Sequence, residues 1–227
     1  MRNLVVAGCS FSDYLDDNDY VYGDRLAMML GARYVHEGAG SGSNWRMWRR
    51  ITNMVLNEKL MPGDIVIVQY TGLERKEFWS DKEPDPKKGS IMVREAYDKN
   101  DGSVIRFKAQ SYKWHKENEA EFLKMFQEHH VSSEFSEEQF NTQHLMFQCM
   151  LKAHNVNTIF LYGRHRQQYP LLEHFKLTMF DEGHEFRKDK STWYHKKDNS
   201  HLCDAGHVEL AKKLFRHIKE LGWHPRK

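Results

Sequence analysis

Four short apolar runs in this chain have the length and the β-branched content of buried strands. Glycine, proline or polar turn residues bound them, and none is long enough to favour a helix. Three of the runs are strongly apolar, whereas the second is weak. The predicted strands are Leu4–Ala7, Arg33–His36, Ile65–Tyr70 and Thr158–Tyr162.

Between and after these runs, apolar residues recur at the three- and four-residue spacing of amphipathic helices. Gly31 directly follows the first such segment, which is typical of the end of a helix. The predicted helices are Asp24–Leu30, Asn44 to about Leu60, Glu137–His154 and about Ala205 to Leu221. The apolar side predicted for the third helix consists of Phe140, Leu145, Met146 and Met150.

The alternation of strands and helices predicts one domain over residues 1–227, an α/β fold with a mainly parallel sheet between two layers of helices. This is a three-layer α/β/α sandwich of flavodoxin-like type. An insertion at about 74–139 follows the third strand, and its aromatic residues form either its own small core, which we favour, or a lid over a substrate. Residues 165–197 show no clear periodicity. In such sheets the active site lies beyond the carboxyl ends of the strands.

The composition limits the classes of protein to which this chain can belong. The chain of 227 residues is 40% hydrophobic and 29% charged, which is typical of a globular domain. Its net charge of +2 gives no electrostatic reason to expect a nucleic-acid partner. No apolar window reaches the length of about 18 residues needed to cross a membrane. The three cysteines are widely spaced and predict no disulfide framework, so we expect a cytoplasmic protein, with a virion as the alternative location.

The first candidate for chemistry is the segment Gly8-Cys9-Ser10-Phe11-Ser12, directly after the first predicted strand. Gly8 allows the backbone to turn sharply, so that the hydroxyl of Ser10 can face a cleft. A serine becomes a strong nucleophile only with a base within hydrogen-bond reach. The structural alternative is that Ser10 merely caps the turn.

The second candidate is Asp198-Asn199-Ser200-His201, which precedes the last predicted helix. At this spacing a carboxylate can orient the imidazole that accepts the proton of a serine. With 14 histidines in the chain, a single Asp-x-x-His has little weight, but Gly206 and the following helix strengthen it. Trp193 and Tyr194 are candidates for substrate contact. No histidine pair has the helical spacing of a zinc protease, so we expect no metal.

Together these segments resemble the SGNH (GDSL-like) hydrolases. That family has a Gly-Asp-Ser block after the first strand, a glycine block after the second, a Gly-x-Asn-Asp block after the third and Asp-x-x-His before the last helix. The chain offers Gly40-Ser41-Gly42-Ser43-Asn44 as its second block. The order of blocks matches over most of the chain outside the insertion. Its Gly-Cys-Ser-Phe opening and Ser43-Asn44 are also similar to SGNH-like proteins of phage genomes.

The resemblance implies a serine ester hydrolase, similar to acetylesterases, that needs no cofactor. Ser10 would be the nucleophile, His201 the base and Asp198 its orienting partner. The backbone N–H groups of Ser10 and Gly42 would bind the oxyanion. The implied substrate is a small-molecule or glycan ester, and neither nucleic acid nor a membrane is expected as a partner.

The chain departs from the family pattern in two blocks. Cys9 replaces the acid of the first block, and no asparagine follows the third strand, where the sequence reads Gln69-Tyr70-Thr71-Gly72-Leu73-Glu74-Arg75. Two substitutes for the missing oxyanion donor remain open, the side-chain amide of Asn44 and the hydroxyl of Thr71. The departure also leaves a second function open, that of a catalytically weak SGNH-like binding or structural module, for example of a phage particle.

Overall fold

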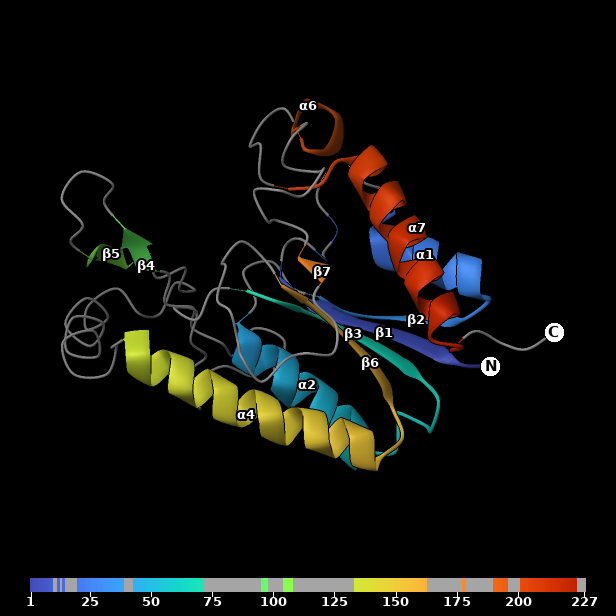
Figure 1. Ribbon diagram of the computed structural model, residues 1–227, viewed down its shortest axis with the longest axis horizontal. Coiled ribbons are helices and arrows are strands. Elements are labelled where there is room, and N and C mark those ends of the chain that lie inside the picture. Colours follow the sequence, from blue (N-terminus) through green and yellow to red (C-terminus); the bar gives the residue numbers. More distant parts are fainter. Residues whose placement is uncertain are drawn as a thin grey trace, which may run out of the picture.

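The computed structural model describes residues 1–9, 12, 14, 20–38, 43–71, 95–97, 104–107, 133–162, 177–178, 190–195 and 201–223 (Figure 1). The elements in chain order are β1 (Asn3–Gly8), α1 (Tyr22–Leu30), β2 (Arg33–Gly38), α2 (Asn44–Leu56), β3 (Ile65–Tyr70), β4 (Glu95–Tyr97), β5 (Val104–Phe107), α4 (Ser133–Ala153), β6 (Asn157–Tyr162), β7 (Leu177–Thr178), α6 (Lys190–Trp193) and α7 (Asp204–Glu220). All four predicted strands and all four predicted helices are confirmed.

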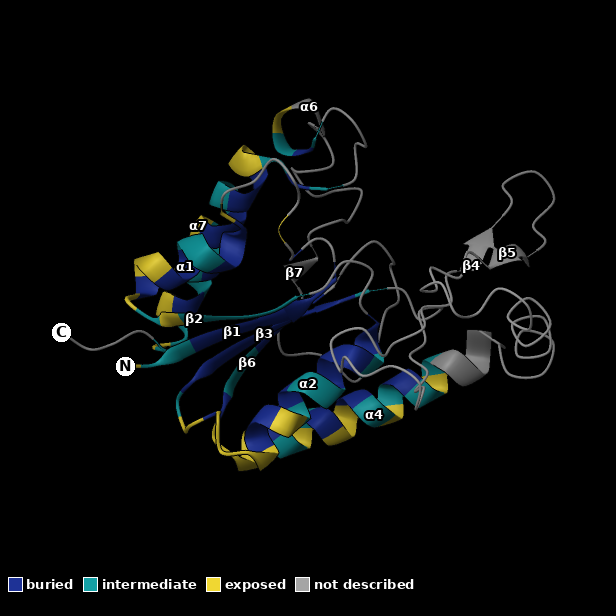
Figure 2. Cartoon of the chain, turned by 180° about the vertical axis from the view of Figure 1, so that it is seen from behind, coloured by how far each residue is buried: buried dark blue, intermediate teal, exposed yellow. Residues whose placement is uncertain are grey.

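The central sheet has the strand order β2-β1-β3-β6-β7, and every neighbouring pair is parallel. Val5 of β1 lies between Val35 of β2 and Val66 of β3. All six residues of β3 are buried, because helices cover both faces of the sheet. Figure 2 shows this centre as an unbroken buried region.

Two layers of helices enclose the sheet. Helices α1 and α7 pack on one face, and α2 and α4 pack on the other (Figures 1 and 2). Each of these helices runs back against the strand direction, so it begins near the carboxyl ends of the strands (Figure 1). The predicted three-layer α/β/α sandwich is therefore confirmed, and its layers bring four helix starts to one edge of the sheet.

Helix α2 begins at Asn44 as predicted, and the Ser43 side chain caps it by accepting the Arg46 backbone N–H at 3.1 Å. One predicted detail differs, because the helix ends at Leu56 rather than near residue 60. It ends there because Glu58 adopts a left-handed φ of 54°, which a continuing helix does not allow.

The apolar side predicted for α4 is partly wrong. Phe140 is buried as predicted, but Leu145 is 46% exposed and Met146 is 68% exposed. The buried stripe is Phe140, His144, Phe147 and Leu151. Its spacing is helical, but a histidine takes one of its positions, and hydrophobicity alone assigns that position to solvent.

The segment at 165–197 holds two elements that its sequence does not predict. Strand β7 pairs with β6, with Leu177 opposite Leu161, and α6 lies just before the His201 segment. Within the insertion, β4 and β5 form an antiparallel pair. Most of the insertion lies outside the described residues, so its proposed core or lid and the domain limits stay predictions. In the described part of the chain, no helix is long and apolar enough to cross a membrane.

Candidate functional site

Three of the six predicted site residues lie within the part of the chain that the structure describes. Residues Ser10, Gly42 and Asp198 lie outside the described residues. Residues Asn44, Thr71 and His201 are described. The structure also describes neighbours of the three others along the chain, and these neighbours define how the edge is built.

The residues that flank Ser10 and Phe11 in the sequence, Cys9 and Ser12, are held in place by several contacts. The backbone N–H of Ser12 donates to the carbonyl oxygen of Cys9 at 2.9 Å, which closes a tight turn from Cys9 to Ser12. Both residues are buried. A Cβ atom on Gly8 would lie 2.4 Å from Ser12 Oγ, and one on Gly38 would lie 2.9 Å from the Ser12 carbonyl oxygen. Glycines at the ends of β1 and β2 therefore allow Ser12 to lie directly over the sheet.

Ser12 is the centre of a buried polar cluster that sequence reasoning missed. Its hydroxyl lies 2.8 Å from Tyr22 Oη and donates to Gln69 Oε1. Burial raises the pKa of Tyr22 far above its usual value, so its phenol remains a neutral hydrogen-bond donor. The available signal was Gln69, a polar residue inside an otherwise apolar central strand.

The second and third blocks are joined by a reciprocal contact. The Thr71 backbone N–H donates to Asn44 Oδ1 at 2.8 Å, and Asn44 Nδ2 donates to the Thr71 carbonyl oxygen at 3.1 Å. Asn44 is only 2% exposed. The two residues predicted as alternative oxyanion donors thus lie together, and the Asn44 amide holds the chain where it leaves β3.

An aromatic cluster of residues from α2, β3 and α4 also supports the end of β3. Trp48 Nε1 donates to Tyr70 Oη at 3.0 Å, and Tyr70 Oη lies 2.5 Å from His144 Nδ1. Burial lowers the pKa of His144 to about 4, so its ring is neutral at pH 7. Since the phenol has one proton, Tyr70 donates to His144 and accepts from Trp48.

The segment with His201 is held by a short antiparallel pairing. The His195 N–H donates to the His201 carbonyl oxygen at 2.9 Å, and the Cys203 N–H donates to the Trp193 carbonyl oxygen at 3.0 Å. Between them, Tyr194 pairs with Leu202. The pairing fixes both sides of the loop that contains Asp198. His201 itself is partly exposed, as a general base requires.

The close fit of this segment corrects one prediction. Tyr194 is 4% exposed and belongs to the hydrophobic core, so it is not available for substrate contact. Gly206 explains how the segment approaches α7, because a Cβ atom there would lie 2.4 Å from the Trp193 carbonyl oxygen. Only glycine allows the helix to pass so near to that carbonyl group.

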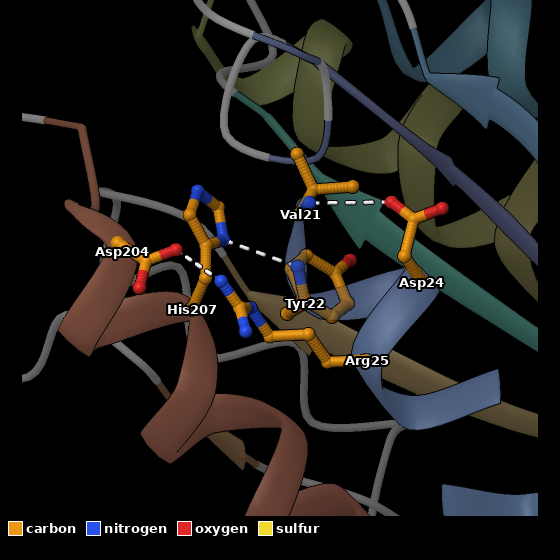
Figure 3. Close-up of polar contacts among 6 residues, drawn as sticks. All are labelled: Val21, Tyr22, Asp24, Arg25, Asp204 and His207. Carbon is orange, nitrogen blue, oxygen red and sulfur yellow. Dashed lines mark hydrogen bonds and ion pairs between the residues drawn. The ribbon is translucent and has the colours of Figure 1, made fainter. Parts of the chain in front are cut away.

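The start of α7 is attached to the start of α1 (Figure 3). His207 Nδ1 accepts the backbone N–H of Tyr22 at 3.3 Å, and Arg25 forms an ion pair with Asp204. Burial first, and the charge of Arg25 second, lower the pKa of His207 to about 4. The ring is therefore neutral and can accept this hydrogen bond.

Tyr22 therefore makes two contacts, one through its backbone and one through its side chain. Its backbone N–H reaches His207 on α7, while its side chain reaches Ser12 on the loop after β1. The loop after β1 and the start of α7, the helix that follows His201, are thus both attached to one residue. Within the described ranges, no three His, Cys, Asp or Glu side chains lie close enough together to hold a metal ion.

Comparisons with known proteins agree with this architecture. A family model described as "Family of unknown function (DUF6071)" matches residues 10–208. A sequence comparison with curated proteins gives no match. Among solved structures, the chain is similar to a lipase/acylhydrolase from Enterococcus faecalis, with 14% identity and a TM-score of 0.52, covering 100% of this chain and 99% of that chain.

Two further structures have the same level of similarity. An acetylxylan esterase, Axe2, from Geobacillus stearothermophilus has 14% identity and a TM-score of 0.51, covering 100% of this chain and 97% of that chain. Protein YXIM from Bacillus subtilis has 14% identity and a TM-score of 0.52, covering 97% of this chain, which spans 57% of that protein's length. At such identities the likeness shows the three-layer α/β/α fold alone.

Proposed function

The chain belongs to the DUF6071 family, and we propose that it is a serine hydrolase that cleaves ester bonds, with Ser10 as its nucleophile. The observation that carries the proposal is the double contact of Tyr22 with Ser12 and His207. It attaches the loop that contains Ser10 and the helix that follows His201 to the same point. A nucleophile and a base must be held within hydrogen-bond reach of each other, and this attachment favours that arrangement.

In the proposed reaction, Ser10 Oγ attacks the ester carbonyl carbon while His201 accepts the serine proton. The tetrahedral intermediate collapses, the bond to the alcohol oxygen breaks, and His201 returns the proton to the leaving alcohol. Water then attacks the acyl-enzyme with His201 as base, which releases the acid and restores the Ser10 hydroxyl. Asp198 orients His201 and stabilises its imidazolium form.

The oxyanion is proposed to accept hydrogen bonds from the backbone N–H groups of Ser10 and Gly42. Removal of one such donor typically lowers the rate about a hundredfold or more. Asn44 and Thr71 complete this part of the proposal. Because Asn44 is buried against the Thr71 backbone, we assign it the task of holding the edge and leave the Thr71 hydroxyl as the direct donor.

The proposed substrate is a small-molecule or glycan ester. The chain shares only its fold with the acetylxylan esterase and the lipase/acylhydrolase. A second candidate function is a binding or structural module with weak or no catalysis. The observation that favours it is the third block, where Thr71 is followed by Gly72, Leu73 and Glu74 and by no asparagine.

A fluorophosphonate probe, which reacts with activated serines, separates these functions. We expect the purified chain to be labelled, Ser10→Ala to show no labelling, and His201→Ala to react roughly 100- to 10,000-fold more slowly, the range typical of a lost general base. Ser136→Ala on α4 and His217→Ala near the end of α7 are matched controls and should label like the unsubstituted chain.

The same experiment defines the contrary result. If the folded chain shows no labelling between about pH 6 and 9, where a histidine base is neutral over most of the range, the non-catalytic module is the better description. If labelling persists in Ser10→Ala, the nucleophile is a different residue. With labelling established, hydrolysis of p-nitrophenyl acetate and of an acetylated xylo-oligosaccharide would test the ester class.

A further inference from the structure

We propose that Ser12 is a positioning residue for the nucleophile, acting through the loop that it shares with Ser10 and without touching the substrate. This inference rests on the proposed function. Ser12 is not one of the residues assigned to the catalytic triad or to binding of the oxyanion. Its contacts nevertheless join it to Cys9 at the other end of that loop and to two further parts of the fold, α1 and β3.

The first attachment is to the loop itself. The Ser12 backbone N–H donates to the Cys9 carbonyl oxygen at 2.9 Å, so the two residues that flank Ser10 and Phe11 are held together. Ser12 cannot shift toward the sheet, because its backbone already lies over Gly38 and its side chain over Gly8. Its hydroxyl contacts also limit its movement.

The second and third attachments use the side-chain hydroxyl. Tyr22 Oη lies 2.8 Å from Ser12 Oγ on the side of α1, and Gln69 Oε1 accepts from Ser12 Oγ on the side of β3. Ser12 donates its one hydroxyl proton to Gln69 Oε1, so the neutral phenol of Tyr22 must be the donor to Ser12. The chain of donors therefore runs in one direction, from Tyr22 to Ser12 to Gln69.

The burial of this cluster indicates that its polar side chains have a specific role. Ser12, Tyr22 and Gln69 are all fully buried. Polar side chains in such a place cost free energy unless they are hydrogen-bonded, and apolar side chains would fill the same space without that cost. Gln69 Nε2 has no hydrogen-bond partner in the part of the chain that the structure describes.

The expected consequence is a loss of rate without a loss of binding. Attack on a carbonyl requires the nucleophile at about 3–3.5 Å, and a displacement of about 1 Å can cost roughly a hundredfold. Because Ser12 is buried, its substitution removes no contact with the substrate. We expect Ser12→Ala to lower kcat on p-nitrophenyl acetate and the rate constant of fluorophosphonate labelling by about 10- to 100-fold, with KM unchanged.

The experiment compares Ser12→Ala and Tyr22→Phe, each with a measured Tm. Tyr22→Phe keeps the ring and removes only the hydroxyl, and we expect a smaller decrease of about 3- to 10-fold, since the contact with Gln69 remains. Tyr34→Phe is the matched control, because its hydroxyl bonds His36 on β2 at 3.0 Å and not Ser12. It should label at the rate of the unsubstituted chain.

Two readouts distinguish positioning from a merely structural role. In the positioning case, every molecule still labels at the end point, only more slowly, and the midpoint of the pH–rate profile stays in place because His201 is unchanged. In the structural case, the labelled fraction falls together with Tm, while the remaining molecules react at the original rate. That second result would overturn the proposal for Ser12.

The failures are also distinguishable. If the unsubstituted chain is labelled and both Ser12→Ala and Tyr22→Phe label equally fast, Ser12 is not a positioning residue and the proposed hydrolase remains. If the unsubstituted chain is not labelled at all, the proposed function fails first and this inference falls with it. If Ser12→Ala does not fold, the rate of Tyr22→Phe decides the matter alone.

Discussion

The two helical layers hold the same edge of the sheet by different means. Between α1 and α7 the contacts at this edge are polar, a hydrogen bond from Tyr22 to His207 and an ion pair between Arg25 and Asp204. Between α2 and α4 the contacts are aromatic, with the Trp48 ring tilted against the rings of Phe140 and Phe147. The polar layer carries the proposed base, whereas the aromatic layer supports the end of β3.

Each layer nevertheless contains one buried, neutral histidine. Burial lowers the pKa of His144 to about 4 in the aromatic layer and that of His207 to about 4 in the polar layer. His144 accepts from a side chain, Tyr70, and His207 accepts from the backbone of Tyr22. A buried imidazole can therefore join packed elements in a polar layer or in an aromatic layer, provided that it remains unprotonated.

The largest expected effect comes from breaking the aromatic layer. Trp48→Ala would leave a cavity among the rings of α2, α4 and β3 and remove the donor to Tyr70. We expect the free energy of unfolding, measured with urea, to fall by about 3–5 kcal/mol. Tyr70→Phe, which keeps the ring, is the control and should cost much less. A loss below about 1 kcal/mol for Trp48→Ala would show that this layer does not depend on its aromatic packing.

Acid should weaken both layers. For His144 and His207 the pKa in the folded chain is about 4 and the usual value is 6.5, so the unfolded chain binds more protons between these pH values. The stabilisation is complete above pH 6.5 and is lost as the pH falls toward 4, by roughly 1.4 kcal/mol per pH unit for each histidine.

Urea unfolding at several pH values would measure this slope. His144→Gln and His207→Gln keep a polar side chain but cannot titrate in this range, so each should remove about half of the histidine contribution to the slope. If neither substitution flattens the slope between pH 6.5 and 4, the acid sensitivity arises from carboxylates and not from these two rings.

A smaller effect is expected from the contact of Asn44 with the Thr71 backbone, a polar clamp in the aromatic layer. Asn44→Ala removes both hydrogen bonds to the Thr71 backbone and leaves a peptide group without its partner. We expect a loss of about 1–3 kcal/mol in the free energy of unfolding and slower fluorophosphonate labelling. Asn53→Ala, on the exposed side of the same helix, is the control. Equal stability of the two variants would contradict the clamp.

The smallest effect is expected at the surface of the polar layer. Arg25 and Asp204 are 26% and 64% exposed at their side chains, and exposed ion pairs contribute about 0–1 kcal/mol. A double-mutant cycle of Arg25→Ala and Asp204→Ala, measured at low and high salt, should give a coupling below about 1 kcal/mol that decreases with salt. A larger, salt-independent coupling would place this pair among the main contacts of the layer.

Much of the fold could be predicted from the sequence. The buried strands are short β-branched runs and the helices are amphipathic, so periodicity finds both. It failed where a polar residue occupies a core position, as His144 does in α4. It also missed β7, because the two residues of that strand carry no pattern and are fixed only by their pairing with β6.

The site was predictable only in part. The motifs around Ser10 and His201 lie next to clear elements, so the topology predicts that they meet at one edge of the sheet. The contacts of Tyr22 with Ser12 and His207 could not be predicted, because they join residues separated by 10 and 185 positions and depend on how α1 meets α7. The burial of Tyr194 was missed for the same reason, since its pairing with Leu202 is a tertiary contact.

The packing of α1 against α7 has a consequence for the synthesis of the chain. During translation α1 leaves the ribosome early, and its apolar side, which includes Leu26 and Leu30, stays uncovered until α7 has followed. The sheet can pair through β6 before then, but one of its faces lacks a helical layer. The nascent chain therefore presents an apolar surface to chaperones until α7 has been synthesised.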